Sequence, residues 1–542
     1  MNPSYHPLPK LTQRSNTAPT SSSDQPIQLH KARRRALDEI NNAQFGWAHL
    51  RSVLISGVGF FTDAYDIFAI NIASTMLGYV LYQGGRLSNE HDLAIKIATP
   101  IGTFCGQILF GWLGDVYGRK SIYGSELIII TLSTLGQALS SSKAMVGWRF
   151  LLGLGIGGDY PLSACITSEV AAIKIRGRMI TAVFASQGFG QLAAAIVSLM
   201  VVRAFERPIR SDKIPGTSVE TCWRLLIGLG AIPAACALYF RLTITESARY
   251  QLNVAQQVAE VEEDGQAFLS SRGEREELGV SSQTTKLTSV PERAFWNHYG
   301  QWNNFKVLFG CAWSWFALDL AFYGLGLNSS IVLTAIGFGQ SLEGTVNDRI
   351  YQSLVNVSVG NIVLSIAGLI PGYWVAFAFI DSWGRKPIQI LGFSALTLLF
   401  LIMGLAYHQL VNHALNLFVI LYCLANFFQN FGPNTTTFVI PAECFPTRYR
   451  STSHGISAAS GKLGAIFAQA GFAGLRDIGG KDQFINRIFV IFSGFMFSGL
   501  LSSCLVPETK GKSLEELCEC YICSRFRKKL TIFFFFLSFH SW

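Results

Sequence analysis

Acidic and aromatic side chains stand inside long apolar stretches of this sequence, where a charged group is costly. Asp159 and Tyr160 are neighbours in one such stretch, and Trp315, Asp319 and Tyr323 recur every four residues in another, which places these three on one helix face. An ionised side chain at the centre of a bilayer costs about 2.5 to 3.5 kcal/mol on insertion scales, so an acid at that depth indicates a functional site. Phenol and indole groups donate hydrogen bonds and a carboxyl group exchanges protons, so the chemistry expected here is anion binding and proton transfer.

The composition predicts what surrounds these side chains. Of 542 residues, 50% are hydrophobic, 14% are charged and 41 residues are Phe, which leaves too little polar surface to cover a water-soluble fold of this size. We therefore predict an all-α polytopic membrane protein with twelve transmembrane helices. The helices are expected near residues 53–81, 93–113, 121–141, 145–170, 179–202, 223–243, 305–333, 352–380, 387–407, 414–440, 453–475 and 485–506. The length of the stretch 145–170 argues against the alternative in which Asp159 only caps a helix end.

Basic residues gather in alternate loops, and this asymmetry predicts the orientation of the helices. They are Arg119, Lys120, Lys174, Arg176, Arg178, Arg385, Lys386, Arg448 and Arg450, with Lys31, Arg33, Arg34 and Arg35 before the first helix and Arg525, Arg527, Lys528 and Lys529 after the last. By the positive-inside rule, these loops and both termini are cytoplasmic. The loop 203–213 departs from the rule, because its arginines and lysine lie on the expected outer side.

Other classes of protein are excluded by the remaining features. The net charge of +9 is explained by cytoplasmic loops and anionic lipids, so no nucleic-acid partner is expected. We find no metal-ligand cluster, P-loop or nucleophile elbow in the sequence, and therefore expect no metal, no cofactor and no enzymatic activity. The glycines at positions 153, 155, 157 and 158 superficially resemble a dinucleotide fingerprint, but they lack a preceding strand and suit close helix packing.

The two halves of the chain repeat each other. The sequence DVYGRK at 115–120 recurs as DSWGRK at 381–386, an offset of 266, and the Glu169–Arg176 pair recurs as Glu443–Arg450, an offset of 274. Such an echo predicts two homologous halves of six helices that rock about a site at mid-membrane. We expect a disordered tail at 1–50, a first half at 51–243, a cytoplasmic linker at 244–304, a second half at 305–506 and a cytoplasmic tail at 507–542.

Two longer motifs resemble a known family. GGDYPLSACITSE at 157–169 and NFGPNTTTFVIPAECFPTRYRSTSHGISAASGK at 430–462 are similar to the fungal and plant phosphate:proton symporters of the major facilitator superfamily. The DxxGRK echoes and PETK at 507–510 are shared more widely within the superfamily. The resemblance implies the major facilitator fold and proton-coupled import of inorganic phosphate by alternating access. It also implies a location in the plasma membrane and function as a monomer.

The resemblance implies a set of working residues as well. The phosphate site would consist of Tyr160, Gln187, Trp315, Asp319, Tyr323 and Asn434, and the proton relay would include Asp63, Glu126 and Asp159. Residue chemistry adds Asp319 and Lys462 to the coupling, because a protonated Asp319 can donate to the anion and a buried Lys462 needs an anionic partner such as Asp319 or a relay acid. Asp66 either belongs to the relay or pairs with a neighbour. Lys462 could instead snorkel toward the cytoplasm from a helix end.

Further residues suit a gate rather than a binding site. Asp115, Arg119, Lys120, Asp381, Arg385 and Lys386 are expected to form contacts between helices on the cytoplasmic side and to stabilise one access state. Trp315 and Tyr323 have an alternative role as packing and interfacial residues. The alternative functions are a glycerophosphodiester or sugar porter of the same fold, and a receptor that senses phosphate through the same pocket.

Both termini are predicted to be cytoplasmic. Reporter fusions at residues 30 and 515 should both report a cytoplasmic location, because the basic loops require an even number of membrane crossings between them. An outside signal from either fusion would contradict the twelve-helix layout and would place Arg119 and Arg385 on different faces.

Overall fold

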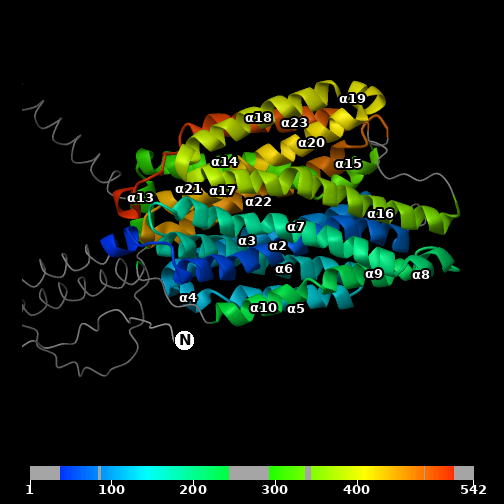
Figure 1. Ribbon diagram of the computed structural model, residues 1–542, viewed down its shortest axis with the longest axis horizontal. Coiled ribbons are helices and arrows are strands. Elements are labelled where there is room, and N and C mark those ends of the chain that lie inside the picture. The colour runs from blue at the N-terminus through cyan, green and yellow to red at the C-terminus, as the bar shows by residue number, and fades with distance from the viewer. Residues whose placement is uncertain are drawn as a thin grey trace, which may run out of the picture.

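The computed structural model describes residues 37–82, 87–242, 249, 292–335, 344–480 and 483–517, and these ranges are overwhelmingly helical and contain no strand (Figure 1). The basic residues Lys31, Arg33, Arg34, Arg35, Arg525, Arg527, Lys528 and Lys529 lie outside the described residues, as do most of the expected linker 244–304 and the tail beyond 517. The expected disordered tail 1–50 needs a correction in its described part. Residues 37–41 are helical and α2 begins at Trp47, because Leu37 and Asn41 are buried against the rest of the protein.

The first part of the chain contains α2 (Trp47–Leu81), α3 (Asn89–Tyr117), α4 (Arg119–Ile122), α5 (Ser125–Leu139), α6 (Ser142–Val170), α7 (Arg176–Ala204), α8 (Glu206–Ser211), α9 (Thr217–Gly228) and α10 (Ala231–Arg241). The second contains α13 (Glu292–Tyr299), α14 (Trp302–Gly326), α15 (Ser329–Ala335), α16 (Val346–Leu364), α17 (Ile370–Trp383), α18 (Arg385–Leu405), α19 (Tyr407–His413), α20 (Leu415–Asn430), α21 (Pro433–Cys444), α22 (Arg450–Leu475) and α23 (Ile485–Ser503).

Among the described residues, eleven helices are long and apolar enough to cross a membrane. Four of these spans join consecutive elements, namely Arg119–Leu139, Thr217–Arg241, Val346–Trp383 and Leu415–Cys444. The predicted helix that is missing from these eleven is the one expected at 453–475, which is α22. It has 26 residues but carries Ser, His and Lys side chains on its buried face. Because α22 packs against α14 and α3, its polar side chains are covered by protein rather than exposed to lipid.

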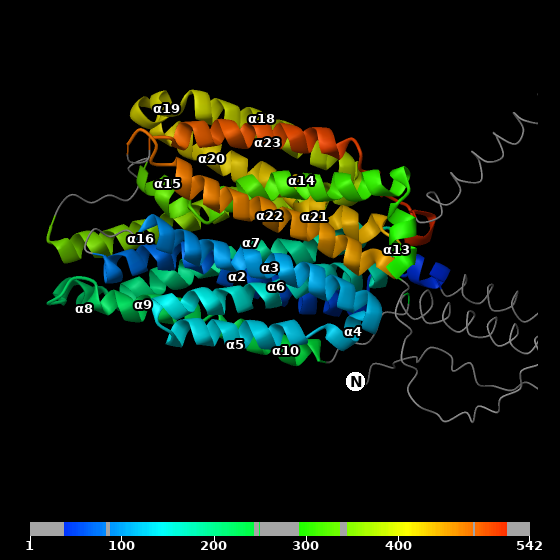
Figure 2. The ribbon, with the colours of Figure 1, turned by 180° about the vertical axis from the view of Figure 1, so that it is seen from behind.

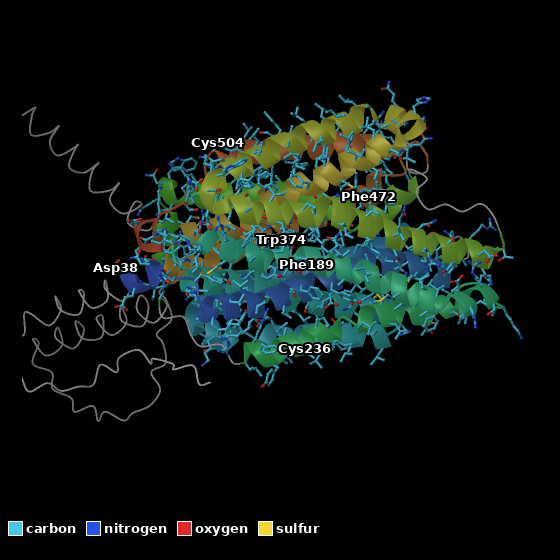
Figure 3. The ribbon with its side chains drawn as sticks, in the orientation of Figure 1. Asp38, Phe189, Cys236, Trp374, Phe472 and Cys504 are labelled. Carbon is cyan, nitrogen blue, oxygen red and sulfur yellow. The ribbon has the colours of Figure 1, made fainter. Side chains whose placement is uncertain are left out.

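The helices form two bundles that lie side by side along their length (Figures 1 and 2). In the first bundle α3 packs on α6 and α2 on α7, and in the second α14 packs on α22 and α18 on α23. The bundles meet along two seams, where α3 contacts α22 and where α7 contacts α16 and α17. Phe189 and Trp374 mark the second seam on the outer surface, with ring centroids 6.3 Å apart (Figure 3). The site expected between the halves is therefore enclosed by α2, α6 and α7 on one side and by α14, α17, α21 and α22 on the other.

The repeated DxxGRK motif builds the same turn in both bundles. Gly118 ends α3 with φ of 88°, and Gly384 ends α17 with φ of 105°. A side chain rarely adopts such a backbone, which explains why glycine stands at this position in both copies. At Gly384 an added methyl group would also lie 2.6 Å from Oε2 of Glu508. The turn directs the following arginine, Arg119 or Arg385, back into the protein, where both are buried.

Several second-half spans are interrupted, which periodicity did not predict. Residues 365–369 form a π-helical turn between α16 and α17, and Phe431 and Gly432 separate α20 from α21, which begins at Pro433. The stretch expected at 305–333 ends as α14 at Gly326, because the Asn328 side chain donates to the Gly324 carbonyl (2.9 Å) and a separate α15 follows. Residues 431 and 432 are buried, whereas the π-helical turn is buried at Ser365, Gly368 and Leu369 and exposed at Ile366 and Ala367.

Candidate functional site

The six residues expected to bind phosphate lie together between the two bundles. Tyr160 comes from α6 and Gln187 from α7, while Asn434 comes from α21 and the other three come from α14. All six are buried, with between 1% and 6% of their surface exposed. The Trp315, Asp319 and Tyr323 face of α14 points inward as its spacing predicts, which excludes the alternative that these aromatic residues anchor the helix at the membrane surface.

One ion pair lies at the centre of this site. The Lys462 ammonium donates to Oδ2 of Asp319 (2.8 Å) and to the Tyr323 hydroxyl (2.9 Å). It also lies 5.1 Å from the ring centroid of Tyr160, within range of a cation–π interaction. Glycine at position 461 makes room for this pair, since a methyl group there would lie 2.8 Å from Oδ2 of Asp319. Lys462 therefore has the buried, acid-paired position that its place in the sequence indicates, and it does not snorkel.

The amide and phenol groups of the site form a chain of hydrogen bonds. Gln187 Nε2 donates to the Tyr160 hydroxyl (2.9 Å), and the Tyr373 hydroxyl donates to Oε1 of Gln187 (3.4 Å). Asn434 Nδ2 in turn donates to the Tyr373 hydroxyl (2.8 Å) and to Oδ1 of Asn430 (2.7 Å). Tyr373 and Asn430 were not predicted from the sequence. The chain connects the first bundle to the second through neutral groups only.

Aromatic rings close the site around these polar groups. The ring centroid of Phe60 lies 5.0 Å from that of Tyr160 and 5.2 Å from that of Phe438, both edge to face. Trp315 packs edge to face on His454 with centroids 5.4 Å apart. Edge-to-face pairs of this kind fill space densely and exclude water. The polar groups of the site therefore interact in a region of low dielectric constant, where hydrogen bonds and charges act strongly.

The expected proton relay forms a second polar cluster inside the first bundle. The Arg241 guanidinium, at the end of α10, donates to Oε1 of Glu126 (2.6 Å) and to Oδ2 of Asp159. Asp159 also accepts from the Ser163 hydroxyl, and the Tyr123 ring lies 4.2 Å beneath the guanidinium. Because consecutive helix residues point about 100° apart, Asp159 faces this cluster while Tyr160 faces the central site. The two sites are thus joined by adjacent residues of one helix.

Asp63 faces the same cluster without a hydrogen bond. It is fully buried on α2, and neither of its carboxylate oxygens has a hydrogen-bond partner among the described residues. Gly59 lies one turn earlier on the same helix face, directly against Arg241 and Asp159. A buried carboxylate without donors is expensive in its ionised form, so the geometry favours a protonated Asp63.

Asp66 lies apart from this cluster. Its Oδ2 accepts from the Thr134 hydroxyl of α5 (2.8 Å). The nearby Arg149 donates instead to the Ile95 carbonyl (2.8 Å) and to Oε1 of Gln137 (3.3 Å). Asp66 thus pairs with Thr134, a neighbour contact of the kind that the sequence allowed.

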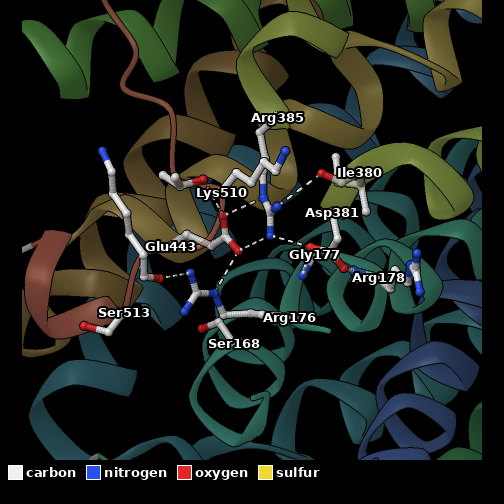
Figure 4. A network of polar contacts seen from close by, with 12 residues as sticks. Ser168, Arg176, Gly177, Arg178, Ile380, Asp381, Arg385, Glu443, Lys510 and Ser513 are labelled. Atoms are coloured by element: carbon white, nitrogen blue, oxygen red, sulfur yellow. Dashed lines mark hydrogen bonds and ion pairs between the residues drawn. The ribbon is translucent and has the colours of Figure 1, made fainter. Parts of the chain in front are cut away.

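At one end of the molecule, which we call the network end, buried ion pairs connect the bundles (Figure 4). Arg385 binds both oxygens of Glu443 (2.8 and 3.0 Å), and Arg176 of the first bundle binds Oε1 of the same carboxylate (2.8 Å). Asp381 pairs with Arg385 (2.9 Å) and accepts from two backbone N–H groups at the start of α7 (3.2 and 3.0 Å).

The same arrangement recurs with the bundles exchanged. Glu169 of the first bundle pairs with Arg119 (3.3 Å) and with Arg450 of the second bundle (3.1 Å). Asp115 pairs with Arg119 (3.2 Å) and accepts from backbone N–H groups at the start of α22 (3.2 and 2.7 Å). Each bundle therefore supplies one arginine to the glutamate of the other, and each aspartate lies at the positive end of a helix from the other bundle.

Two of the six predicted gate residues make different contacts. Lys120 is exposed on α4. The Lys386 ammonium donates to the Cys504 carbonyl (3.0 Å) and its backbone N–H donates to Glu508 (2.9 Å), so these contacts remain within the second bundle. Both lysines follow the turn glycine by two positions and neither is buried, whereas the preceding arginines are.

Segments beyond the helices join the network end. The Lys512 carbonyl accepts from Nη2 of Arg176 (2.8 Å), and the Thr509 hydroxyl donates to Glu443 (2.5 Å). Arg249 binds Glu515 (3.1 Å) and the Asn41 side chain (2.5 Å). Burial lowers the pKa of the Arg249 guanidinium, and the neighbouring Glu515 carboxylate opposes that shift. The N-terminal segment, the residues after α10 and the residues after α23 thus converge at one place.

At the opposite end, hydrogen bonds of amide, hydroxyl and ammonium groups connect the bundles. Asn71 donates to the Ser329 hydroxyl (2.6 Å), which donates to Asn361 (2.7 Å), and Lys96 donates to Asn328 (3.0 Å). With contacts at both ends and a buried centre, the structure is an occluded form.

The basic loop 203–213, which departs from the positive-inside rule, lies at this opposite end. Arg210 pairs with Glu206 (3.1 Å) and with Asp348 of the second bundle. The Tyr351 hydroxyl donates to Glu206 (2.8 Å), and this bond together with Arg210 and Arg203 lowers the pKa of Glu206. Two basic residues of this loop, Arg203 and Arg210, are therefore paired with acids.

The residues that sequence reasoning missed are mainly partners of those it found. Arg241 stands at the end of an apolar stretch, where it resembles an ordinary loop arginine. Three buried relay acids need a nearby cation, and this need could have pointed to Arg241. Glu169, Arg176, Glu443 and Arg450 were recognised as an echo but not as gate residues. Tyr373 carries no signal, because one tyrosine in an apolar helix is common.

Comparisons with solved structures identify the fold. The fold matches that of the major facilitator superfamily proton:xylose symporter XylE with a TM-score of 0.65 and 20% identity, over 87% of this chain and 99% of that one. An inward-open form of XylE from E. coli matches with a TM-score of 0.58, 21% identity and coverage of 86% and 98%. The chain therefore has the same fold as these solved structures.

The family follows from sequence comparison. Residues 52–521 match the family model described as sugar (and other) transporter. The chain is 45% identical to the repressible high-affinity phosphate permease of Neurospora crassa, over 90% of this chain and 89% of that protein. It is 44% identical to the inorganic phosphate transporter PHO84 of Saccharomyces cerevisiae, over 90% and 87%. The chain belongs to the sugar (and other) transporter family, in the branch of the fungal and plant inorganic phosphate transporters.

The close packing at Gly59 generates a prediction. A methyl group at this position would overlap Nη2 of Arg241 and Oδ2 of Asp159, so Gly59→Ala should displace the guanidinium from its two acids. Disrupting a buried ion pair costs about 3 to 5 kcal/mol, and the temperature of thermal unfolding in detergent should fall clearly. Gly147→Ala on α6 is the matched control, since nothing lies within 4 Å of the added methyl group. Equal unfolding temperatures for the two variants would contradict the proposed contact.

Proposed function

We propose that the protein imports inorganic phosphate together with protons by alternating access of its two bundles. The observation that carries this proposal is the Lys462–Asp319 pair, enclosed by neutral donors and closed off at both ends. The names of the relatives in Neurospora crassa and Saccharomyces cerevisiae support phosphate as the substrate. Radiolabelled phosphate uptake in a transporter-null cell, with and without a protonophore, tests transport and proton dependence together.

The central site offers phosphate a cation and several neutral donors. The Lys462 ammonium supplies positive charge, while Tyr160, Gln187, Tyr323, Trp315 and Asn434 supply hydrogen bonds. Phosphate competes with Asp319 for the ammonium. An ionised Asp319 would repel the anion, whereas a protonated Asp319 donates a hydrogen bond to it. Phosphate binding and protonation of Asp319 therefore favour each other, which is the basis of coupling in this proposal.

The relay cluster carries the protons in the first bundle. Glu126 and Asp159 share the guanidinium of Arg241, and Asp63 lies beside them without a hydrogen bond. Ionisation of all three acids would therefore leave uncompensated charge in a buried site. At least one acid is expected to hold a proton in the occluded form, and the carboxylate without hydrogen-bond donors, Asp63, is the one we assign. Asp159 connects the relay to the phosphate site through its neighbour Tyr160.

The network end is assigned to the cytoplasmic side of a plasma membrane. The loops with Arg119 and Arg385 lie at this end, together with the described residues near both termini. Opening this end requires separation of the Arg176–Glu443 and Arg450–Glu169 pairs. Arg119 and Arg385 bind the same two glutamates, and Asp115 and Asp381 bind helix starts of the other bundle. We therefore assign Asp115, Arg119, Asp381 and Arg385 as gate residues. In this assignment the first half, 51–243, moves as one body relative to the second half, 305–506, with the linker 244–304 in the cytoplasm, and one chain suffices for transport.

Two substitutions test the phosphate site. Tyr160→Phe and Gln187→Ala each remove one donor, and a hydrogen bond to a charged group contributes about 1.5 to 3 kcal/mol, or tenfold or more in affinity. Both variants should raise the phosphate concentration for half-maximal uptake while protein at the membrane stays near the parent level. Competition by glycerophosphodiesters and by sugars should leave phosphate uptake unaffected. Unchanged half-saturation in both variants would show that the pocket is assigned wrongly.

Asp319→Asn separates binding from coupling. Asparagine imitates the protonated acid in shape and donates a hydrogen bond, but it cannot release a proton. The variant should bind phosphate with weaker pH dependence and should fail to concentrate it. Asp319→Glu moves the carboxyl group and should impair binding itself. The measurements are phosphate binding to purified protein across pH, and uptake into proteoliposomes with an imposed proton gradient. Concentrative uptake by the Asn variant at the parent level would transfer the coupling role to Asp63, Glu126 or Asp159.

A further inference from the structure

One hydroxyl group in the central site belongs to a residue with no expected role. Tyr373 lies on α17 with 1% of its surface exposed. Its hydroxyl accepts a hydrogen bond from Asn434 of α21 (2.8 Å) and donates to Gln187 of α7 (3.4 Å). Tyr373 therefore touches a predicted phosphate-binding residue from each bundle.

The backbone around Tyr373 is built to bring it to this position. The π-helical turn at 365–369 directly precedes α17 and changes the face that the helix presents to the interior. On the opposite side of the seam stands Gly188, where a methyl group would lie 3.1 Å from the Tyr373 ring. The Phe184 ring packs edge to face on Tyr373 with centroids 6.0 Å apart. These features fix the phenol beside Gln187 and explain why α7 carries glycine at the next residue.

The hydrogen bonds of Tyr373 join amide groups from the two bundles. Gln187 Nε2 donates to the Tyr160 hydroxyl and Asn434 Nδ2 donates to the Tyr373 hydroxyl, so the amide donors that phosphate needs are engaged by phenols of the site itself. When an oxyanion enters between them, the Tyr373 hydrogen is released from the long 3.4 Å bond at little cost. Its oxygen remains free to accept from Asn434 or from a phosphate hydroxyl.

We propose that Tyr373 is a seventh phosphate-binding residue, whose hydroxyl donates to the bound anion and links its occupancy to contact between the bundles. This inference rests on the proposed function. It also concerns specificity, because phosphate near neutral pH carries at least one P–OH group and needs an acceptor as well as donors. A phenol oxygen provides both, whereas sulfate presents acceptors only. A purely structural Tyr373 would instead affect folding and leave affinity unchanged.

The test is Tyr373→Phe, which removes only the oxygen atom. Tyr422→Phe is the matched control, because Tyr422 is a buried tyrosine of α20 that stacks on Phe418 and lies outside the hydrogen-bonded chain. Purified parent and variants are compared for phosphate binding, with sulfate as competitor, and for uptake by proteoliposomes. We expect the half-saturating phosphate concentration to rise about tenfold in Tyr373→Phe and not in Tyr422→Phe. We also expect sulfate to compete better in Tyr373→Phe than in the parent, with the amount of folded protein unchanged.

Two outcomes would overturn the inference and are distinguishable. If the parent binds phosphate and Tyr373→Phe binds it equally well with equal discrimination against sulfate, Tyr373 is not a phosphate ligand, even if the variant unfolds at a lower temperature. If the parent itself neither binds nor transports phosphate, the proposed function fails and the role of Tyr373 fails with it.

Discussion

The structure depends on the high cost of an unpaired charge in a protein interior surrounded by lipid. The network end follows this constraint closely, because four arginines face two glutamates and two aspartates and the charges balance. The centre holds one cation against one carboxylate. Among the described residues, the cluster around Arg241 holds more acids than bases, because Glu126 and Asp159 pair with one guanidinium and Asp63 lies beside them. In the proposed function, this is the place where a proton resides.

Charge balance also gives the proposed transport cycle a direction. In the occluded form the Lys462–Asp319 pair is neutral without substrate, and an anion that joins it must be accompanied by a proton to keep it neutral. The ends differ in what must be broken to expose the centre. The network end requires separation of several buried ion pairs, whereas the opposite end is closed largely by amide, hydroxyl and lysine contacts. The opposite end should therefore open more readily when the central site is empty.

The fold could be predicted almost completely from the sequence, because hydrophobic length and the repeated DxxGRK motif depend on local pattern. The inward face of Trp315, Asp319 and Tyr323 followed from helical spacing alone. Arg241 and Tyr373 could not be found in this way, because their partners are distant in the chain. Arg241 binds Glu126 and Asp159, 115 and 82 positions away, and Tyr373 binds Gln187 and Asn434, 186 and 61 positions away. The breaks at 365–369 and at 431–432 were also missed, because an apolar run has the same periodicity whether or not the helix inside it is continuous.

The two echo offsets, 266 for the DxxGRK motif and 274 for the glutamate–arginine pair, show where the halves diverged in length. The first bundle passes from α5 to α6 with almost no connection, whereas the second inserts α19 between α18 and α20 at the end opposite the network. Added chain was accommodated at this turn while the ion pairs at the far end kept their register. The turn around α19 is therefore a natural insertion point for an epitope or a rigid fusion partner, which would give a protein of this size a recognisable landmark for particle alignment in electron microscopy.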